Sequence, residues 1–291
     1  MAVSEERTLA LPWGTLSALS FGDPAGVPVL GLHGWQDNAA TFEGLAPHLE
    51  GVHLVALDLP GHGRSSWRPS GMDYGFLSWV VDAFHAADAL GWETFGLLGH
   101  SMGAGIASLM AGTLPERVDR MVLLEGLGPL SNRAEDAPGQ LAEAMLAEAR
   151  HGSVGERVFE SLEDAAERRQ AAAGILSDAS ARTLMTRGTV PVEGGVRWCP
   201  DPRIRAASRI RLTEAQTLAF LRQITAPTLL VRALQGWPFE RERMADRIEC
   251  IQHRSRLEVE GGHHVHLDAP ERVAAAVRAL LVSGSLPGAS G

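Results

Sequence analysis

Residues 94–103 read TFGLLGHSMG. Within this stretch a short apolar run is followed by the pattern Gly-x-Ser-x-Gly, and a helical pattern begins near Ser101. A serine between a strand and a helix adopts a strained backbone that lifts its hydroxyl out of the sheet, and Gly99 and Gly103 remove side chains that would clash there. The N-terminus of the helix then lies beneath the hydroxyl and favours developing negative charge. The stretch predicts a nucleophile at Ser101.

Short apolar runs and helical patterns alternate on both sides of this turn. After a hairpin, the expected strands are 27–32, 52–57, 94–98, 121–124, 228–231 and 257–259. The expected helices are 42–49, 76–90, a stretch from 101, and 270–281. Such alternation predicts an α/β fold with a mostly parallel central sheet and helices on both faces.

The alternation stops near residue 128. Residues 129–222 are rich in Ala, Glu and Arg, and their helical patches are 140–151, 154–173, 180–187 and 213–221. An insertion of roughly 90 residues at this place is typical of a lid over an active site. We therefore expect a core of residues 1–128 and 223–291, with a helical lid, or cap, at 129–222 after the sixth strand.

The composition and charge of the chain disfavour several classes of function. The 291 residues include 26 basic and 35 acidic side chains, a net charge of −9 that disfavours binding to nucleic acid. No uncharged apolar stretch reaches the ~18 residues of a membrane helix, and the first residues lack a secretion-signal pattern. We expect Cys199 and Cys250 to stay free in a cytoplasmic protein. We expect a small-molecule substrate and no cofactor, and the sequence does not indicate an oligomeric state.

A serine hydroxyl needs a base that takes its proton. Residues 262–268 read GHHVHLD and follow the last expected strand. His263 comes where a loop that leaves a strand end presents its side chain above the sheet, so we expect it to be the base. His264 and His266 are expected to pack or to support it. The alternative is a metal site that these histidines form with Asp268, but neighbouring histidines on an extended loop diverge, and we expect no metal.

The orienting carboxylate has two candidates. Glu125 follows the expected strand 121–124, at the same carboxyl edge of the sheet as Ser101, and a carboxylate there could fix the tautomer of the imidazole. The alternative role for Glu125 is to cap the strand. Glu240 is the nearest carboxylate after the strand 228–231, but it begins a charged helical pattern. We expect Glu125 to be the acid.

The tetrahedral intermediate of acyl transfer needs hydrogen-bond donors. One is the amide of Met102, and the other should come from the loop after the strand 27–32, where the Trp35 amide is the natural candidate. We expect Trp35 and His100 to line the substrate pocket. An ordinary turn with a buried tryptophan is the alternative for Trp35.

These motifs resemble those of a known family. The order HG, DLPGHGRS, GHSMG and GH, at 33–34, 58–65, 99–103 and 262–263, is that of the α/β-hydrolases. Within the third of these motifs, Ser101 takes the place of the nucleophile. Asp58 of the second is expected to organise its own loop. The similarity is greatest to the serine hydrolase-like proteins, through PWG, HGWQDN and Leu-x-x-Arg-Gly at 12–14, 33–38 and 184–188.

The resemblance covers residues 8–281. It implies the α/β-hydrolase fold, with Ser101 as nucleophile and His263 as base. Glu125 falls where haloalkane dehalogenases keep an acid, but those enzymes and epoxide hydrolases use an Asp nucleophile, so Ser101 disfavours both activities.

The sequence therefore predicts a serine hydrolase that cleaves a carboxylic ester, or a related acyl bond, of a small apolar substrate. Two alternatives keep the fold. The first is a non-catalytic receptor or vestigial site, and the second is an acyltransferase or perhydrolase that uses the same triad.

Overall fold

The computed structural model describes residues 4–151, 158–206, 208–238 and 241–286. A central sheet contains the strands β1 (Glu5–Leu11), β2 (Gly14–Phe21), β3 (Val27–Leu32), β4 (Val52–Leu57), β5 (Phe95–His100), β6 (Val118–Leu124), β10 (Thr228–Ala233) and β11 (Arg254–Val259). Their order is β1-β2-β4-β3-β5-β6-β10-β11, and only the β1–β2 and β2–β4 pairs are antiparallel. The predicted α/β-hydrolase fold with a mostly parallel sheet is confirmed.

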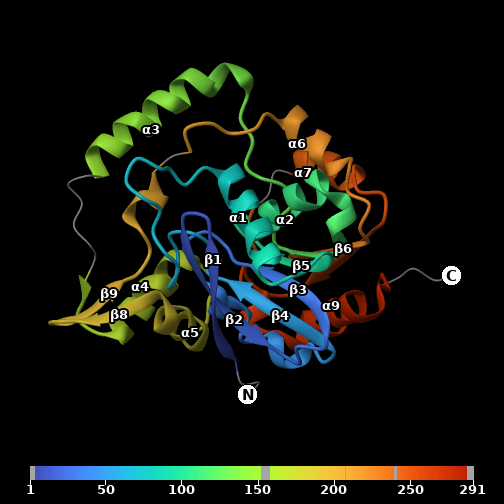
Figure 1. The fold of residues 1–291 in the computed structure, drawn as a ribbon, viewed down its shortest axis with the longest axis horizontal. Helices are drawn as coiled ribbons and strands as arrows, with labels where there is room; N and C mark the ends of the chain where they lie inside the picture. The colour runs from blue at the N-terminus through green and yellow to red at the C-terminus, as the bar shows by residue number, and fades with distance from the viewer. Residues whose placement is uncertain (1–3, 152–157, 207, 239–240, 287–291) are drawn as a thin grey trace.

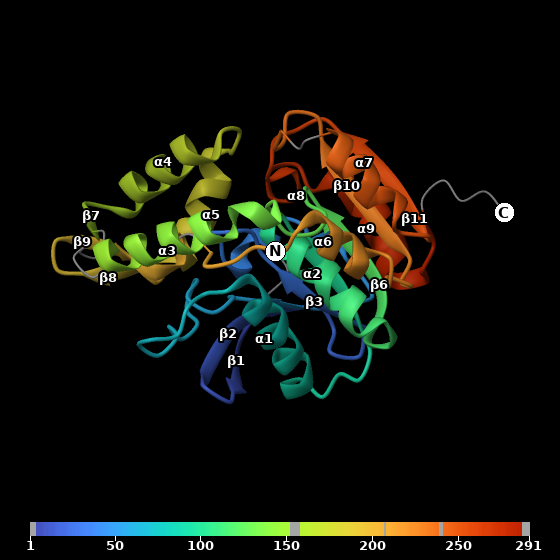
Figure 2. The same cartoon turned by 90° about the horizontal axis from the view of Figure 1, so that it is seen from above.

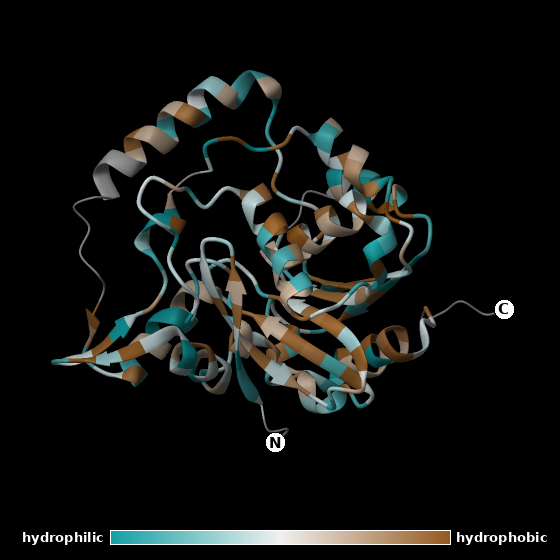
Figure 3. Cartoon of the chain, in the orientation of Figure 1, coloured by the Kyte–Doolittle hydropathy of each residue, from teal (hydrophilic) through white to brown (hydrophobic). Residues whose placement is uncertain are grey.

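Helices cover both faces of this sheet (Figure 1). One face packs against α1 (Phe76–Ala89) and α2 (Met102–Thr113), and the other packs against α9 (Glu271–Ser283). Because both faces are covered, every residue of β4 and β5 is buried, and much of the central sheet is coloured as hydrophobic in Figure 3.

The segment 129–222, called the insert below, follows β6. Its elements are α3 (Ala137–His151), β7 (Val158–Phe159), α4 (Leu162–Ala173), α5 (Asp178–Gly188), β8 (Thr189–Val192), β9 (Gly195–Trp198) and α6 (Glu214–Leu221). Seen from above, α3, α4, α5 and the three short strands lie to one side, away from β10 and β11 (Figure 2). Helix α6 instead packs against α2, where Leu221 joins the main core.

Parts of the insert differ from the helices expected there. The strands β7, β9 and β8 form a small antiparallel sheet, because Gly194 and Gly195, both with positive φ, turn the chain back between β8 and β9. The helix expected at 154–173 begins only at Leu162, since the Ser161 hydroxyl accepts a hydrogen bond from the Asp164 amide and caps it. Residues 152–157 lie outside the described part.

Two further expectations need correction. The helix expected at 42–49 is replaced by two 3₁₀ turns, Ala39–Phe42 and Ala46–His48; Pro47 cannot donate a helical hydrogen bond. After β11 the chain forms a short helix, α8 (Val265–Asp268), rather than an extended loop. Helix α7 (Arg241–Glu249) precedes β11.

None of the helices in the described part of the chain is both long and apolar enough to cross a lipid bilayer.

Candidate active site

Ser101 lies at the junction of β5 and α2, with φ 54° and ψ −114°. This is the strained turn that the Gly-x-Ser-x-Gly pattern predicts. A Cβ atom at Gly103 would lie 2.0 Å from the Leu32 carbonyl oxygen, and one at Gly99 would meet backbone at 2.6 Å. The Ser101 amide donates to the Leu124 carbonyl at 2.9 Å. The turn is therefore tied to the end of β6, directly before Glu125.

Glu125 is buried just beyond β6, and its backbone also has a positive φ of 54°. Its Oε1 atom accepts the Ala233 amide at 2.6 Å, and Oε2 accepts the Trp237 amide at 3.0 Å. Oε2 also accepts a hydrogen bond from His263 Nδ1 at 3.1 Å. The structure thus brings together two of the predicted residues, Glu125 and His263.

Residues 234–238, after β10, include no carboxylate of their own, but they bind the carboxylate of Glu125. A Cβ atom at Gly236 would lie 1.9 Å from Glu125 Oε2, so the missing side chain makes room for the carboxylate of the other strand. The two amide bonds from this loop then fix its orientation. Glu240, the other candidate acid, lies outside the described residues.

His263 lies in the loop between β11 and α8. Its side chain is 17% exposed, and its ring lies 4.8 Å from that of His100 and 5.9 Å from that of Trp237, between ring centroids. Gly262 packs against the insert, because a Cβ atom there would lie 2.6 Å from Ile175 Cβ. His263 is the most accessible ring of this histidine cluster.

From its place beside Ser101 we expected His100 to line the substrate pocket, but the structure buries it. It is fully buried, and its Nε2 atom donates to the His263 carbonyl at 2.9 Å. Burial lowers the pKa of His100 to about 3, so the ring is neutral near pH 7. The buried, neutral His100 therefore supports the His263 loop through its hydrogen bond to the His263 carbonyl.

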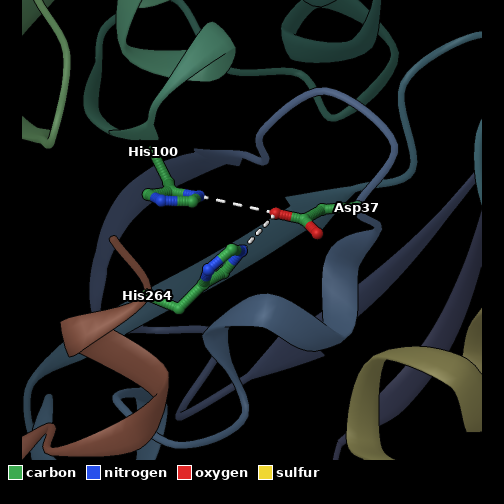
Figure 4. A group of neighbouring side chains, drawn as sticks. All are labelled: Asp37, His100 and His264. Carbon is green, nitrogen blue, oxygen red and sulfur yellow. Dashed lines mark hydrogen bonds and ion pairs between the residues drawn. The ribbon is translucent and has the colours of Figure 1, made fainter. Parts of the chain in front are cut away.

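A second carboxylate–histidine pair lies behind the first, and the sequence analysis missed it (Figure 4). The buried Asp37 accepts a hydrogen bond from His264 Nε2 at 3.0 Å, and its Oδ2 atom lies 3.6 Å from His100 Nδ1. Arg169 of α4 donates to Asp37 Oδ1 at 2.5 Å. Burial by itself raises the pKa of Asp37, but Arg169 and His264 bring it well below its usual value. In the sequence, the Asp37 of the HGWQDN stretch was the feature that could have indicated this second pair.

Three of these side chains have the donor types of a metal site. The donor atoms of Asp37, His100 and His264 lie within 4.8 Å of one another, and two imidazoles with a carboxylate suit a transition metal. In this structure, however, the Arg169 guanidinium already supplies the positive charge beside Asp37. The group differs from the His263, His264, His266 and Asp268 set considered from sequence. His266 instead contacts the Thr41 hydroxyl at 2.9 Å, and Asp268 accepts the Ser177 amide.

The two amides expected to bind an oxyanion come from neighbouring elements. Met102 is the first residue of α2, where helix amides have no partner within the helix. Trp35 lies in the loop after β3, next to Gln36, whose φ is 62°. The Trp35 indole donates to the Ile204 carbonyl of the insert at 3.2 Å, so the side chain is directed toward the insert.

Asp58 organises its loop, as expected. Its carboxylate accepts the amides of Ala39 and Arg64, both at 2.8 Å, and pairs with the buried Arg187 of α5 at 2.9 Å. Arg187 belongs to the Leu-x-x-Arg-Gly stretch, and Asn38 of the HGWQDN stretch donates to the Leu184 carbonyl at 2.8 Å. The two sequence stretches therefore join the insert to the core.

Comparisons with known proteins agree with this fold. A family model for the alpha/beta hydrolase fold matches residues 27–150. A serine hydrolase-like protein of Danio rerio is 37% identical over 95% of this chain and 87% of its own length.

Two solved structures cover 96% of this chain and 99% of their own. One, of a hypothetical protein from Pseudomonas aeruginosa PAO1, is 42% identical with a TM-score of 0.89. The other, of a thioesterase domain from the curacin biosynthetic pathway, is 30% identical with a TM-score of 0.81.

Proposed function

The chain belongs to the serine hydrolase-like proteins of the α/β-hydrolase superfamily, and from this premise we propose that it cleaves an ester-type acyl bond through Ser101, His263 and Glu125. The observation that carries the proposal is the hydrogen bond from His263 Nδ1 to the buried Glu125 carboxylate. This bond fixes the proton on Nδ1 and leaves Nε2 to take the proton of the Ser101 hydroxyl.

The reaction then proceeds in two halves. Ser101 Oγ attacks the carbonyl carbon while His263 takes its proton, and the amides of Met102 and Trp35 hold the oxyanion. As the intermediate collapses, His263 passes the proton to the leaving group and an acyl-enzyme remains. Water, deprotonated by His263, attacks the acyl-enzyme and releases the acid and Ser101.

The substrate class is proposed from exposed apolar side chains on three segments that carry or adjoin the proposed site residues. Trp35, Ile175 and Trp237 are exposed by 49%, 54% and 57%, and they come from the β3 loop, the insert and the β10 loop. Ile175 packs on Gly262 and Trp237 packs beside His263. Exposed apolar side chains around a polar site favour an apolar acyl or alcohol group. We propose that the insert acts as a cap that shapes this entrance.

Thioesters are a second candidate class. The chain is 30% identical to a solved thioesterase domain over nearly its whole length. The same oxyanion and acyl-enzyme chemistry serves both bonds, and only the leaving group differs. We further propose a cytoplasmic location, which is consistent with the two free thiols, Cys199 and Cys250.

A fluorophosphonate probe tests the nucleophile directly. We expect the wild-type protein to be labelled at Ser101, and Ser101→Ala to be unlabelled although it is folded. Matched p-nitrophenyl esters and acyl thioesters of increasing chain length then test the substrate class, with faster turnover expected for longer acyl groups. A folded wild-type protein that neither reacts with the probe nor turns over any of these substrates would support the non-catalytic alternative.

A further inference from the structure

Asp37 lies where four parts of the molecule meet. It belongs to the loop after β3, and its carboxylate contacts Arg169 of α4, His100 at the end of β5, and His264 before α8. Figure 4 shows the two imidazoles directed toward the carboxylate. His100 directly precedes Ser101 in the chain, and His264 directly follows His263. One carboxylate therefore touches the neighbour of each reacting residue.

The charge balance of this group depends on Arg169. His100 donates from Nε2 to the His263 carbonyl and is neutral near pH 7, so its Nδ1 atom faces Asp37 Oδ2 with a lone pair. Nδ1 has no hydrogen-bond partner in the described part of the chain. Two electron-rich atoms that face each other at 3.6 Å in a buried site repel. The Arg169 guanidinium, only 15% exposed, offsets that repulsion.

We propose that Arg169 is a positioning residue for the His263 loop: it neutralises Asp37, so that this carboxylate holds His264 beside His263 without repelling the ring of His100. The cap would then contribute to the reaction through one side chain, without touching the reacting atoms. This inference rests on the proposed function, in which His263 is the base.

Arg169 is not needed to hold the insert on the core. The buried Arg187 pairs with Asp58, and Asn38 donates to the Leu184 carbonyl. These contacts are independent of Asp37. Removal of the Arg169 charge should therefore leave the insert docked on the core, although it costs stability as any broken buried pair does, and its specific effect should appear in the reaction.

The electrostatic effect on His263 has a definite sign. The titratable groups that contact its ring are Glu125, His100 and His264. One contact further away, His266 lies against the rings of His100 and His264, Asp37 faces both of these rings, and Arg169 binds Asp37. Loss of the positive Arg169 leaves the negative Asp37 uncompensated, and a negative charge nearby favours the protonated form of His263. The acidic limb of the kcat/KM profile should therefore move to higher pH.

The experiment compares Arg169→Gln, Arg169→Lys and the control Arg182→Gln. Arg182 is another arginine of the insert; it is exposed and pairs with Glu163 on the surface. We expect Arg169→Gln to lower kcat roughly tenfold with KM within about threefold, and to shift the acidic limb upward by roughly half a pH unit. Arg169→Lys, which keeps the charge, should recover most of kcat and the wild-type limb. Arg182→Gln should match the wild type.

The titration of His263 itself separates this inference from the proposed function. Imidazole NMR signals of the wild type and Arg169→Gln, with His263 assigned by its absence in His263→Ala, report the His263 pKa even if no substrate is turned over. An upward shift in Arg169→Gln supports the coupling. A folded Arg169→Gln protein with an unchanged His263 titration and an unchanged kcat overturns it, while loss of probe labelling in the wild type counts against the proposed function alone.

Discussion

Two consecutive histidines, His263 and His264, are each held by a buried carboxylate, but the two pairs are built differently. Glu125 takes two backbone amides and the ring of His263, and every donor comes from the core. Asp37 takes the ring of His264 and a guanidinium from the insert.

The difference has a consequence for each ring. His263 is partly exposed, so it can exchange a proton with a substrate group, whereas His264 is buried against Asp37. We infer that the first pair performs proton transfer and that the second holds the loop in place. The predictions below separate these two roles.

The largest effect should come from Glu125→Gln. Its amide group cannot accept from every donor that the carboxylate serves, and it no longer favours the Nδ1–H tautomer of His263. We expect kcat to fall by about 10³- to 10⁴-fold, measured with the best ester substrate. Glu240→Gln should remain near the wild type. The opposite pattern would assign the acid to Glu240.

The glycines beside the two carboxylates offer a matched test. A Cβ atom at Gly236 would lie 1.9 Å from Glu125 Oε2, whereas one at Gly34 would lie 3.0 Å from Asp37 Oδ2. Gly236→Ala should displace the Glu125 carboxylate and lower kcat by about 10²-fold, since a misplacement of about 1 Å can cost that much. Gly34→Ala should cost less than about tenfold. Equal losses in the two variants would contradict the distinction between the pairs.

The sequence predicts the first pair but not the second. Glu125 was identifiable because it follows a strand at the same edge as Ser101, and parallel strands place their carboxyl ends together. The Asp37–Arg169 contact joins residues 132 positions apart, and Arg169 lies in a charged stretch without a strand pattern. A local pattern carries no information about which helix face of the insert meets the core.

The same reason explains the errors inside the insert. The helix expected at 154–173 and the missed hairpin of β8 and β9 both lie where the small core is formed by few apolar residues, among them Phe159 and Leu184. The inner strands β3, β4, β5, β6 and β10 were predictable because each contains an apolar run that is largely buried on both faces. An apolar run is easy to recognise as a strand in a sequence, whereas a short, half-exposed strand has no such pattern.

Asp37→Asn should affect stability more than the reaction. It leaves Arg169 beside a neutral amide, and loss of one partner of a buried pair costs about 3 kcal/mol. The folded-state pKa of Asp37 is below its unfolded value, so its stabilising contribution is present above about pH 4 and is lost as the pH falls further. The gap in thermal unfolding temperature between wild type and Asp37→Asn should therefore narrow from pH 7 to pH 3.

The surface pair of Glu163 and Arg182 supplies the control for this measurement. Both side chains are more than half exposed, so Glu163→Gln should change the unfolding temperature much less than Asp37→Asn does at pH 7. A gap for Asp37→Asn that is no larger than for Glu163→Gln would show that the Asp37 pair does not stabilise the fold.

The smallest effect should come from Trp35→Phe, in the loop that also carries Asp37. The substitution removes the indole bond to the Ile204 carbonyl, which costs about 1 kcal/mol of stability, but it keeps the backbone amide that is proposed to bind the oxyanion. We expect kcat within about threefold of the wild type, with the larger change in KM for long acyl chains, as measured by steady-state kinetics on the ester series. A drop in kcat of about 10²-fold or more would mean that the indole, and not only the amide of Trp35, acts on the transition state.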